Sequence, residues 1–63
     1  MRNNIRNLRK QAGLRQEDIA KKLGVTRQTV IAIENGKYNP TLELAIKIAR
    51  LFKLSVEEIF YLD

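Results

Sequence analysis

Two adjacent side chains, Arg27 and Gln28, offer the most specific chemistry in this chain of 63 residues. An arginine can donate two hydrogen bonds to guanine O6 and N7, and a glutamine can form two with the N6 and N7 edge of adenine. Catalysis and metal binding have less support, because the sequence contains neither cysteine nor histidine. Their absence removes thiolate chemistry, the commonest general base and the commonest metal ligand. We therefore expect no enzyme activity, no metal site, no cofactor and no small-molecule ligand.

Charge is distributed unevenly along the chain. Residues 1–37 carry nine basic and three acidic side chains, whereas residues 38–63 carry three basic and four acidic ones. A basic half joined to a nearly neutral half indicates one surface that faces a polyanion such as nucleic acid. The alternative is a solvated surface whose imbalance arose by chance.

The length of the chain predicts one small domain, residues 1–63, without an internal repeat or linker. A chain this short buries only about 60% of its unfolded surface, so its stability should be modest. No apolar run approaches the roughly 20 residues needed to cross a bilayer. The first residues, MRNNIRNLRK, lack the apolar stretch of a signal peptide. We therefore expect a cytoplasmic protein with no membrane partner.

The spacing of apolar residues predicts an all-α fold. Apolar side chains recur three and four positions apart between the sparse glycines and the single proline, and no segment alternates for long enough to predict a strand. Thr26, Thr41 and Ser55 can cap helices, the last within an S-x-x-E capping box. We predict helices over 3–12, 16–23, 27–34 and 42–52, and a last short helix that follows Ser55 and carries Val56, Ile59, Phe60 and Leu62.

Two of these helices, 16–23 and 27–34, are joined by a short turn that contains Gly24. This helix-turn-helix geometry presents the second helix to the major groove of DNA. Glycine suits the turn because it adopts a positive φ at no steric cost. Residues 16–35 are therefore the predicted DNA-reading unit.

Three segments carry a resemblance to a known family: QEDIAKKLGVTRQTV, IENGKYNPTLELAIKIA and LSVEEIF. They resemble the Xre family of regulators, the Cro and C1 repressor type of phage lambda and its relatives, from about Ile5 to Leu62. The resemblance implies a five-helix, lambda-repressor-like fold with 27–34 as the recognition helix. It also implies a transcription regulator, expected to be a repressor, that binds double-stranded operator DNA sequence-specifically. Because one recognition helix makes few contacts, we expect a homodimer on an inverted repeat, with half-sites about 10–10.5 base pairs apart.

The same resemblance assigns roles to individual residues. It places Arg27, Gln28 and Ala32 toward base edges, and Ile31 lies on the same exposed face. Ile31 has two interpretations, contact with a thymine methyl group or cover for its neighbours. The resemblance assigns phosphate contacts to Gln16, Asn35, Lys37 and Asn39, and we add Arg15 and Thr26 to this set. Arg9 and Glu34 match a charge pair that joins the first helix to the end of the third.

Two positions depart from the family pattern. Arg15 stands where the family usually has Ser, Thr or Asn as a helix cap, and the missing cap costs about 1 kcal/mol. Arg15 can compensate by reaching a phosphate. Lys53 stands where the family usually has glycine, and a left-handed lysine costs on the order of 1 kcal/mol. Neither position lies on the recognition helix, so the functional expectation is unchanged.

Several further residues leave alternatives open. We expect five basic residues to be solvated charges more than phosphate contacts: Arg2, Arg6, Lys10, Lys21 and Lys22. A mobile N-terminal arm is one interpretation of the first residues. Phe60, Tyr61 and Leu62 cannot all point inward from one helix, which indicates a dimer interface shared with the loop around Tyr38. Antitoxins and co-regulators of the same fold are the alternative functional class, with a toxin or another regulator as protein partner.

Overall fold

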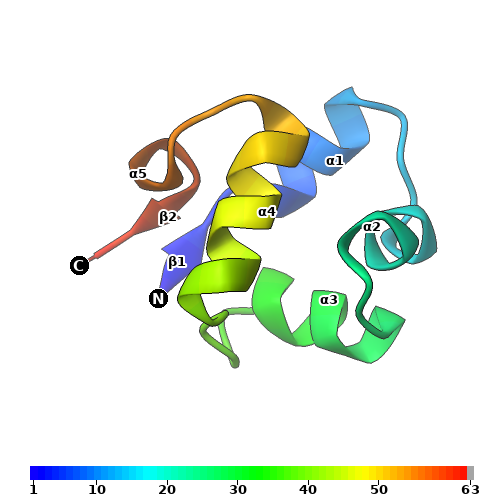
Figure 1. Ribbon diagram of the computed structural model, residues 1–63, viewed down its shortest axis with the longest axis horizontal. Coiled ribbons are helices and arrows are strands. Elements are labelled where there is room, and N and C mark those ends of the chain that lie inside the picture. Colours follow the sequence, from blue (N-terminus) through cyan, green and yellow to red (C-terminus); the bar gives the residue numbers. More distant parts are fainter. Residues whose placement is uncertain (63) are drawn as a thin grey trace.

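Five helices and a short two-stranded ribbon make up residues 1–62, the part of the chain that the computed structural model describes (Figure 1). The elements, in chain order, are β1 (Arg2–Asn3), α1 (Ile5–Gln11), α2 (Gln16–Leu23), α3 (Arg27–Glu34), α4 (Leu42–Phe52), α5 (Val56–Ile59) and β2 (Phe60–Tyr61). The five-helix fold expected from the sequence is confirmed, and α2, α3 and α4 have the predicted bounds.

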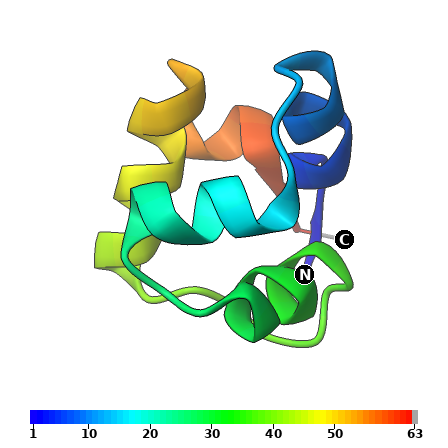
Figure 2. The same ribbon diagram turned by 90° about the vertical axis from the view of Figure 1, so that its right-hand side faces the viewer.

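The helices enclose one apolar core. Its most deeply buried large side chains are Ile19 of α2, Ile48 of α4 and Ile59 of α5. Ile5 of α1 and Ile33 of α3 pack into the same cluster, so every helix contributes to it. Figure 2 shows α1 and α4 on either side of α2, with α3 along the lower edge of the molecule, as it also is in Figure 1. The core therefore fixes α2 and α3 as a pair and leaves the outer side of α3 at the surface.

The two ends of the described chain form a ribbon that the sequence did not predict. β1 and β2 pair antiparallel, with Arg2 opposite Tyr61 and Asn3 opposite Phe60. The all-α class is confirmed, and this ribbon is a small addition to it. Two-residue strands are too short to produce an alternating pattern in the sequence. The first residues, for which a mobile arm was one interpretation, pair with Phe60 and Tyr61 in this ribbon. The ribbon also shortens α1 and α5 relative to their predicted lengths.

The predicted helix caps are present. Thr26 Oγ1 accepts a hydrogen bond from Thr29 N at 3.2 Å, and Thr41 Oγ1 accepts one from Leu44 N at 3.2 Å. Ser55 and Glu58 form the reciprocal capping box: Glu58 N donates to Ser55 Oγ at 3.3 Å, and Ser55 N donates to Glu58 Oε1 at 3.0 Å. These bonds satisfy backbone N–H groups that have no partner within the helix.

The side chain of Arg15 does not cap α2, and Asp18 provides part of the missing cap. The arginine side chain offers no acceptor, but Arg15 N donates to Asp18 Oδ2 at 2.8 Å. This backbone hydrogen bond from Arg15 lowers the pKa of Asp18 below its ordinary value. The Arg15 guanidinium is 77% exposed and lies 3.2 Å from Glu17 Oε1. Asp18 therefore supplies half of a capping box, and the charge of Arg15 stays at the surface.

Lys53 ends α4 in the left-handed conformation, with φ 58° and ψ 40°, as the departure from the family pattern predicted. Among residues 1–62 it is the one non-glycine residue with positive φ. We expect Lys53→Gly to stabilise the domain by about 0.5–1 kcal/mol, because glycine lacks the Cβ that makes this conformation costly but is more flexible when unfolded. Thermal unfolding by circular dichroism measures the gain. Lys53→Ala is the control, since alanine keeps the Cβ; an equal gain for both variants contradicts the explanation.

No helix within residues 1–62 combines the length and the apolar character needed to cross a membrane.

Candidate nucleic-acid interface

The outer side of α3 carries the residues predicted to contact bases. Val30 and Ile33 are buried against the core, whereas Arg27 and Gln28 are exposed, and Ile31 and Ala32 are half-buried. We call Arg27, Gln28, Ile31 and Ala32 the recognition face. The turn before α3 passes through Gly24, which has φ 72° and ψ 32°. This left-handed turn and the Thr26 cap set the direction in which the first turn of α3 leaves the molecule.

A hollow with a cationic rim lies beside the start of α2. It has a volume of about 350 Å³ and is lined by Arg9, Arg15, Gln16, Glu17 and Arg27. The structure therefore brings two predicted phosphate contacts, Arg15 and Gln16, beside a predicted base contact, Arg27. Guanidinium groups at the surface suit a phosphate, which they can bind in a bidentate manner. Arg27 therefore lies both on the first turn of α3 and beside Arg15 and Gln16.

The loop after α3 presents the other predicted phosphate contacts. Asn35, Lys37 and Asn39 are all exposed, as is Tyr38, and Gly36 turns the chain with φ 72°. Gly36 is also close to the N-terminal arm, since a Cβ at this position would lie 3.3 Å from Met1 O. Polar side chains therefore lie beyond the C-terminal end of α3, whereas the hollow lies at its N-terminal end, beside Arg27.

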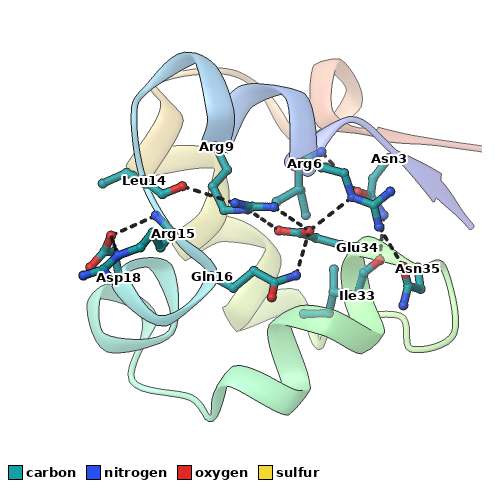
Figure 3. A network of polar contacts seen from close by, with 11 residues as sticks. Asn3, Arg6, Arg9, Leu14, Arg15, Gln16, Asp18, Ile33, Glu34 and Asn35 are labelled. Atoms are coloured by element: carbon teal, nitrogen blue, oxygen red, sulfur yellow. Dashed lines mark hydrogen bonds and ion pairs between the residues drawn. The ribbon is translucent and has the colours of Figure 1, made fainter.

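A buried carboxylate, Glu34, joins these parts. Its side chain has no exposed surface. Arg9 Nε donates to Glu34 Oε2 at 2.7 Å and Arg9 Nη2 donates to Oε1 at 3.2 Å, which is the predicted ion pair. Gln16 Nε2 also donates to Oε1 at 3.3 Å, and Arg6 Nε lies 3.5 Å from the same oxygen. Figure 3 shows these side chains converging on Glu34 from α1 and α2. We call Arg6, Arg9, Gln16 and Glu34 the Glu34 cluster.

The cluster keeps Glu34 ionised. Burial by itself would raise the pKa of Glu34, but hydrogen bonds from Arg9 and Gln16, the charge of Arg9 and a hydrogen bond from Arg6 outweigh it. The pKa therefore lies below its ordinary value. The cluster joins α1, α2 and α3, and removal of Glu34 would leave the largely buried Arg9 without its carboxylate, which is costly.

The sequence did not indicate the contacts of Asn3, which lies beside the cluster, or of Arg6, which belongs to it and was expected to be solvated. Asn3 Nδ2 donates to Ile33 O at 2.8 Å, and Asn3 Oδ1 accepts from Ile5 N at 3.1 Å, so this side chain ties the arm to the end of α3. Arg6 Nη2 donates to Asn35 Oδ1 at 2.8 Å. Arg6 precedes Arg9 by three positions, a spacing that puts both on one side of α1. That spacing was an available signal for Arg6, whereas nothing local indicated the role of Asn3.

The predicted dimer-interface residues separate into buried and exposed ones. Phe60 is only 7% exposed and belongs to the core, so we remove it from the predicted interface. Leu62 is 88% exposed and Tyr38 is 43% exposed, while Tyr61 is half-buried and its hydroxyl donates to Glu58 O at 3.3 Å.

α4 adds exposed apolar residues that the sequence analysis assigned to no surface. Leu42 is 75% exposed and Ile46 is 40% exposed. They are four positions apart, so they share one side of the helix. The signal was the run LELAIKIA, in which apolar residues exceed those that one buried side of a helix needs.

Comparison with known proteins agrees with this geometry. A helix-turn-helix family model matches residues 5–59, from the start of α1 to the end of α5. An uncharacterised helix-turn-helix-type transcriptional regulator of Methanocaldococcus jannaschii is 57% identical over 60 residues, which are 95% of this chain and 91% of that protein. The cryptic phage CTXphi transcriptional repressor RstR of Vibrio cholerae is 36% identical over 55 residues, 87% of this chain and 50% of the repressor.

A solved structure gives the same result for the fold. The crystal structure of the restriction-modification controller protein C.AhdI from Aeromonas hydrophila superposes with a TM-score of 0.79 and 34% sequence identity, covering 89% of this chain and 85% of the controller. The two relatives are named as transcription regulators, and the solved structure is named as a restriction-modification controller. The chain therefore belongs to the helix-turn-helix family of DNA-binding transcription regulators, in its Xre or Cro/C1 type.

Proposed function

We propose that this regulator is a repressor whose α3 lies in the major groove of an operator and reads it with the recognition face. The observation that carries the proposal is the arrangement around α3. Arg27 and Gln28 are exposed on its first turn, Arg15 and Gln16 flank one end, and Asn35, Lys37 and Asn39 flank the other. Groups that bind phosphate on both sides of groups that bind bases form the pattern expected for a helix in the major groove. We place this activity in the cytoplasm.

Two copies of the chain are proposed to bind one operator. A helix of eight residues is only about 12 Å long, so one copy reads few base pairs. A two-fold pair would read an inverted repeat with half-sites about 10–10.5 base pairs apart. Exposed apolar side chains are available for the contact between copies: Tyr38, Leu42, Ile46, Tyr61 and Leu62.

Selection of bound duplexes from a random pool, followed by sedimentation with the selected site, tests this proposal. We expect a palindromic site and two chains per duplex. Leu42→Ser and Leu62→Ser identify the contact, because the variant that disrupts it should lose the two-to-one complex while the other retains it. A one-to-one complex on the selected site contradicts the dimer.

The affinity for duplex DNA should also fall linearly with salt concentration on a logarithmic plot. Absence of any salt-dependent duplex binding would contradict the DNA-binding proposal and favour the class of antitoxins and co-regulators that bind a protein partner.

A further inference from the structure

Arg6 is a half-exposed arginine held in place from two sides. Its side chain is 51% exposed, Nε lies 3.5 Å from Glu34 Oε1, and Nη2 donates to Asn35 Oδ1 at 2.8 Å. Figure 3 shows it between Glu34 and Asn35, above the end of α3. A guanidinium carries five N–H donors in a planar fork. The two contacts engage only part of this fork, so donors remain for a further acceptor.

The charge of Arg6 is not balanced by the carboxylate that orients it. Glu34 carries one negative charge, and Arg9 already binds both of its oxygens at 2.7 and 3.2 Å. Arg9 is 12% exposed, whereas Arg6 is 51% exposed. The cluster of Arg6, Arg9 and Glu34 therefore has a net charge of about +1, because two guanidinium groups face one carboxylate. The surplus positive charge lies at the surface, on Arg6.

The position of this charge is defined by Asn35. Asn35 begins the exposed loop that the proposed function places along the phosphate backbone, and the Arg6 guanidinium is within hydrogen-bond distance of it. An oriented guanidinium with free donors binds phosphate well, because little side-chain freedom is lost on binding. A freely rotating surface lysine has no such advantage.

We propose that Arg6 binds a backbone phosphate of the DNA beside Asn35, and that Glu34 is the positioning residue for this contact and for the one made by Gln16. The proposal rests on the proposed function. Gln16 and Arg6 both contact Glu34 Oε1, at 3.3 and 3.5 Å. One buried carboxylate therefore fixes the relative positions of two phosphate-binding groups, one on α2 and one on α1.

The first experiment compares Arg6→Gln with Lys10→Gln in the full chain, using a plain duplex of arbitrary sequence. Lys10 is an exposed residue of the same helix, so both variants remove one positive charge from α1. We expect Arg6→Gln to weaken binding several-fold and to reduce the salt slope by about one unit per subunit. Lys10→Gln should leave the slope nearly unchanged. Equal changes in the two slopes would overturn the proposal, since Arg6 would then act only through the net charge.

The second experiment uses Glu34→Gln, for which two explanations predict opposite signs. Removal of a negative charge near the DNA should tighten binding if only the long-range field matters. If Glu34 positions Arg6 and Gln16, binding should weaken several-fold instead. Circular dichroism identifies a temperature at which the unaltered chain and Glu34→Gln are both folded. Duplex affinity is compared at that temperature, so a lower unfolding temperature of the variant does not affect the result. Tighter binding by Glu34→Gln would overturn the positioning role.

These experiments distinguish a failure of the proposed DNA-binding function from a failure of the phosphate contact assigned to Arg6. If the unaltered chain shows no salt-dependent binding to duplex, the proposed function is wrong. If the unaltered chain binds duplex and Arg6→Gln behaves like Lys10→Gln, only the assignment of Arg6 is wrong.

Discussion

Glu34→Ala should destabilise the domain by about 3–5 kcal/mol, the range found when one partner of a buried ion pair is removed. The Glu34 side chain is fully buried and Arg9 is 12% exposed, so the variant leaves a guanidinium largely buried without its carboxylate. It also removes acceptors for Gln16 and Arg6. For a domain this small, such a loss approaches the whole free energy of unfolding. Urea unfolding followed by circular dichroism measures it.

Glu43→Ala is the matched control. Glu43 is also a helical glutamate in an ion pair, with Lys47 Nζ 3.5 Å from Glu43 Oε1, but the two side chains are 80% and 53% exposed. Exposed pairs of this kind contribute at most about 1 kcal/mol. If Glu34→Ala costs no more than Glu43→Ala, the buried pair does not carry the expected stability.

Acidification tests the same ion pair without shortening the side chain at position 34. The folded pKa of Glu34 lies below its ordinary value of 4.5, so ionised Glu34 stabilises the fold above that pH. This stabilisation should disappear as the pH falls below 4.5 toward the folded pKa. The difference in stability between the unaltered chain and Glu34→Gln should therefore shrink on acidification. A difference that is constant from neutral to acidic pH would show that the charge of Glu34 is not responsible.

The second large effect concerns sequence specificity. Gln28→Ala should cost about 1–3 kcal/mol on the selected operator and little on random duplex, because a two-point contact with a base is lost. Lys37 lies past the end of α3, in the exposed loop. Lys37→Ala should therefore weaken all sequences alike and reduce the salt slope by about one unit. Titrations of both variants on both duplexes at several salt concentrations separate the two kinds of contact.

Arg27→Ala tests whether Arg27 contacts a base or only a phosphate. Arg27 lines the hollow that Arg15 and Gln16 also line, so its guanidinium lies near two proposed phosphate contacts as well as on the first turn of α3. We expect a loss of about 1–3 kcal/mol confined to the operator, as for Gln28. An equal loss on random duplex would make Arg27 a phosphate contact. The operator sequence would then be recognised by Gln28, Ile31 and Ala32, or through the shape of the DNA.

The helices were predictable because their signals are local. Apolar spacing and the caps Thr26 and Thr41 define α3 and α4 within the sequence of each helix, and the structure reproduces their predicted bounds. The ribbon was not predictable, since it depends on pairing between residues at opposite ends of the chain. The same division holds in the site. Exposure of Arg27 and Gln28 follows from the apolar pattern of one helix.

The side-chain contacts of the site that could not be predicted are between residues far apart in the sequence. Arg6 meets Asn35 from 29 positions away, and Asn3 meets Ile33 from 30 positions away. The sequence does not reveal such partners, although the spacing of Arg6 and Arg9 places both on one side of α1. The prediction of the Arg9–Glu34 pair rested on the resemblance to a known family and on helix ends that must meet. The run LELAIKIA indicated an excess of apolar residues, but it did not identify Leu42 and Ile46 as the exposed ones. An apolar residue on a surface looks the same in a sequence as one in a core.

The pairing of Arg2 with Tyr61 has a consequence for the order of folding. It closes a loop of nearly the whole chain, and the entropy of loop closure increases with loop length. Contacts of such high sequence separation are slow to form compared with those inside helices or between α2 and α3. We therefore expect the ribbon to assemble after the helical core. Asn3, which is part of β1, donates to the carbonyl of Ile33 near the end of α3. The latest event in folding would thus also add the hydrogen bond from Asn3 to the end of the recognition helix.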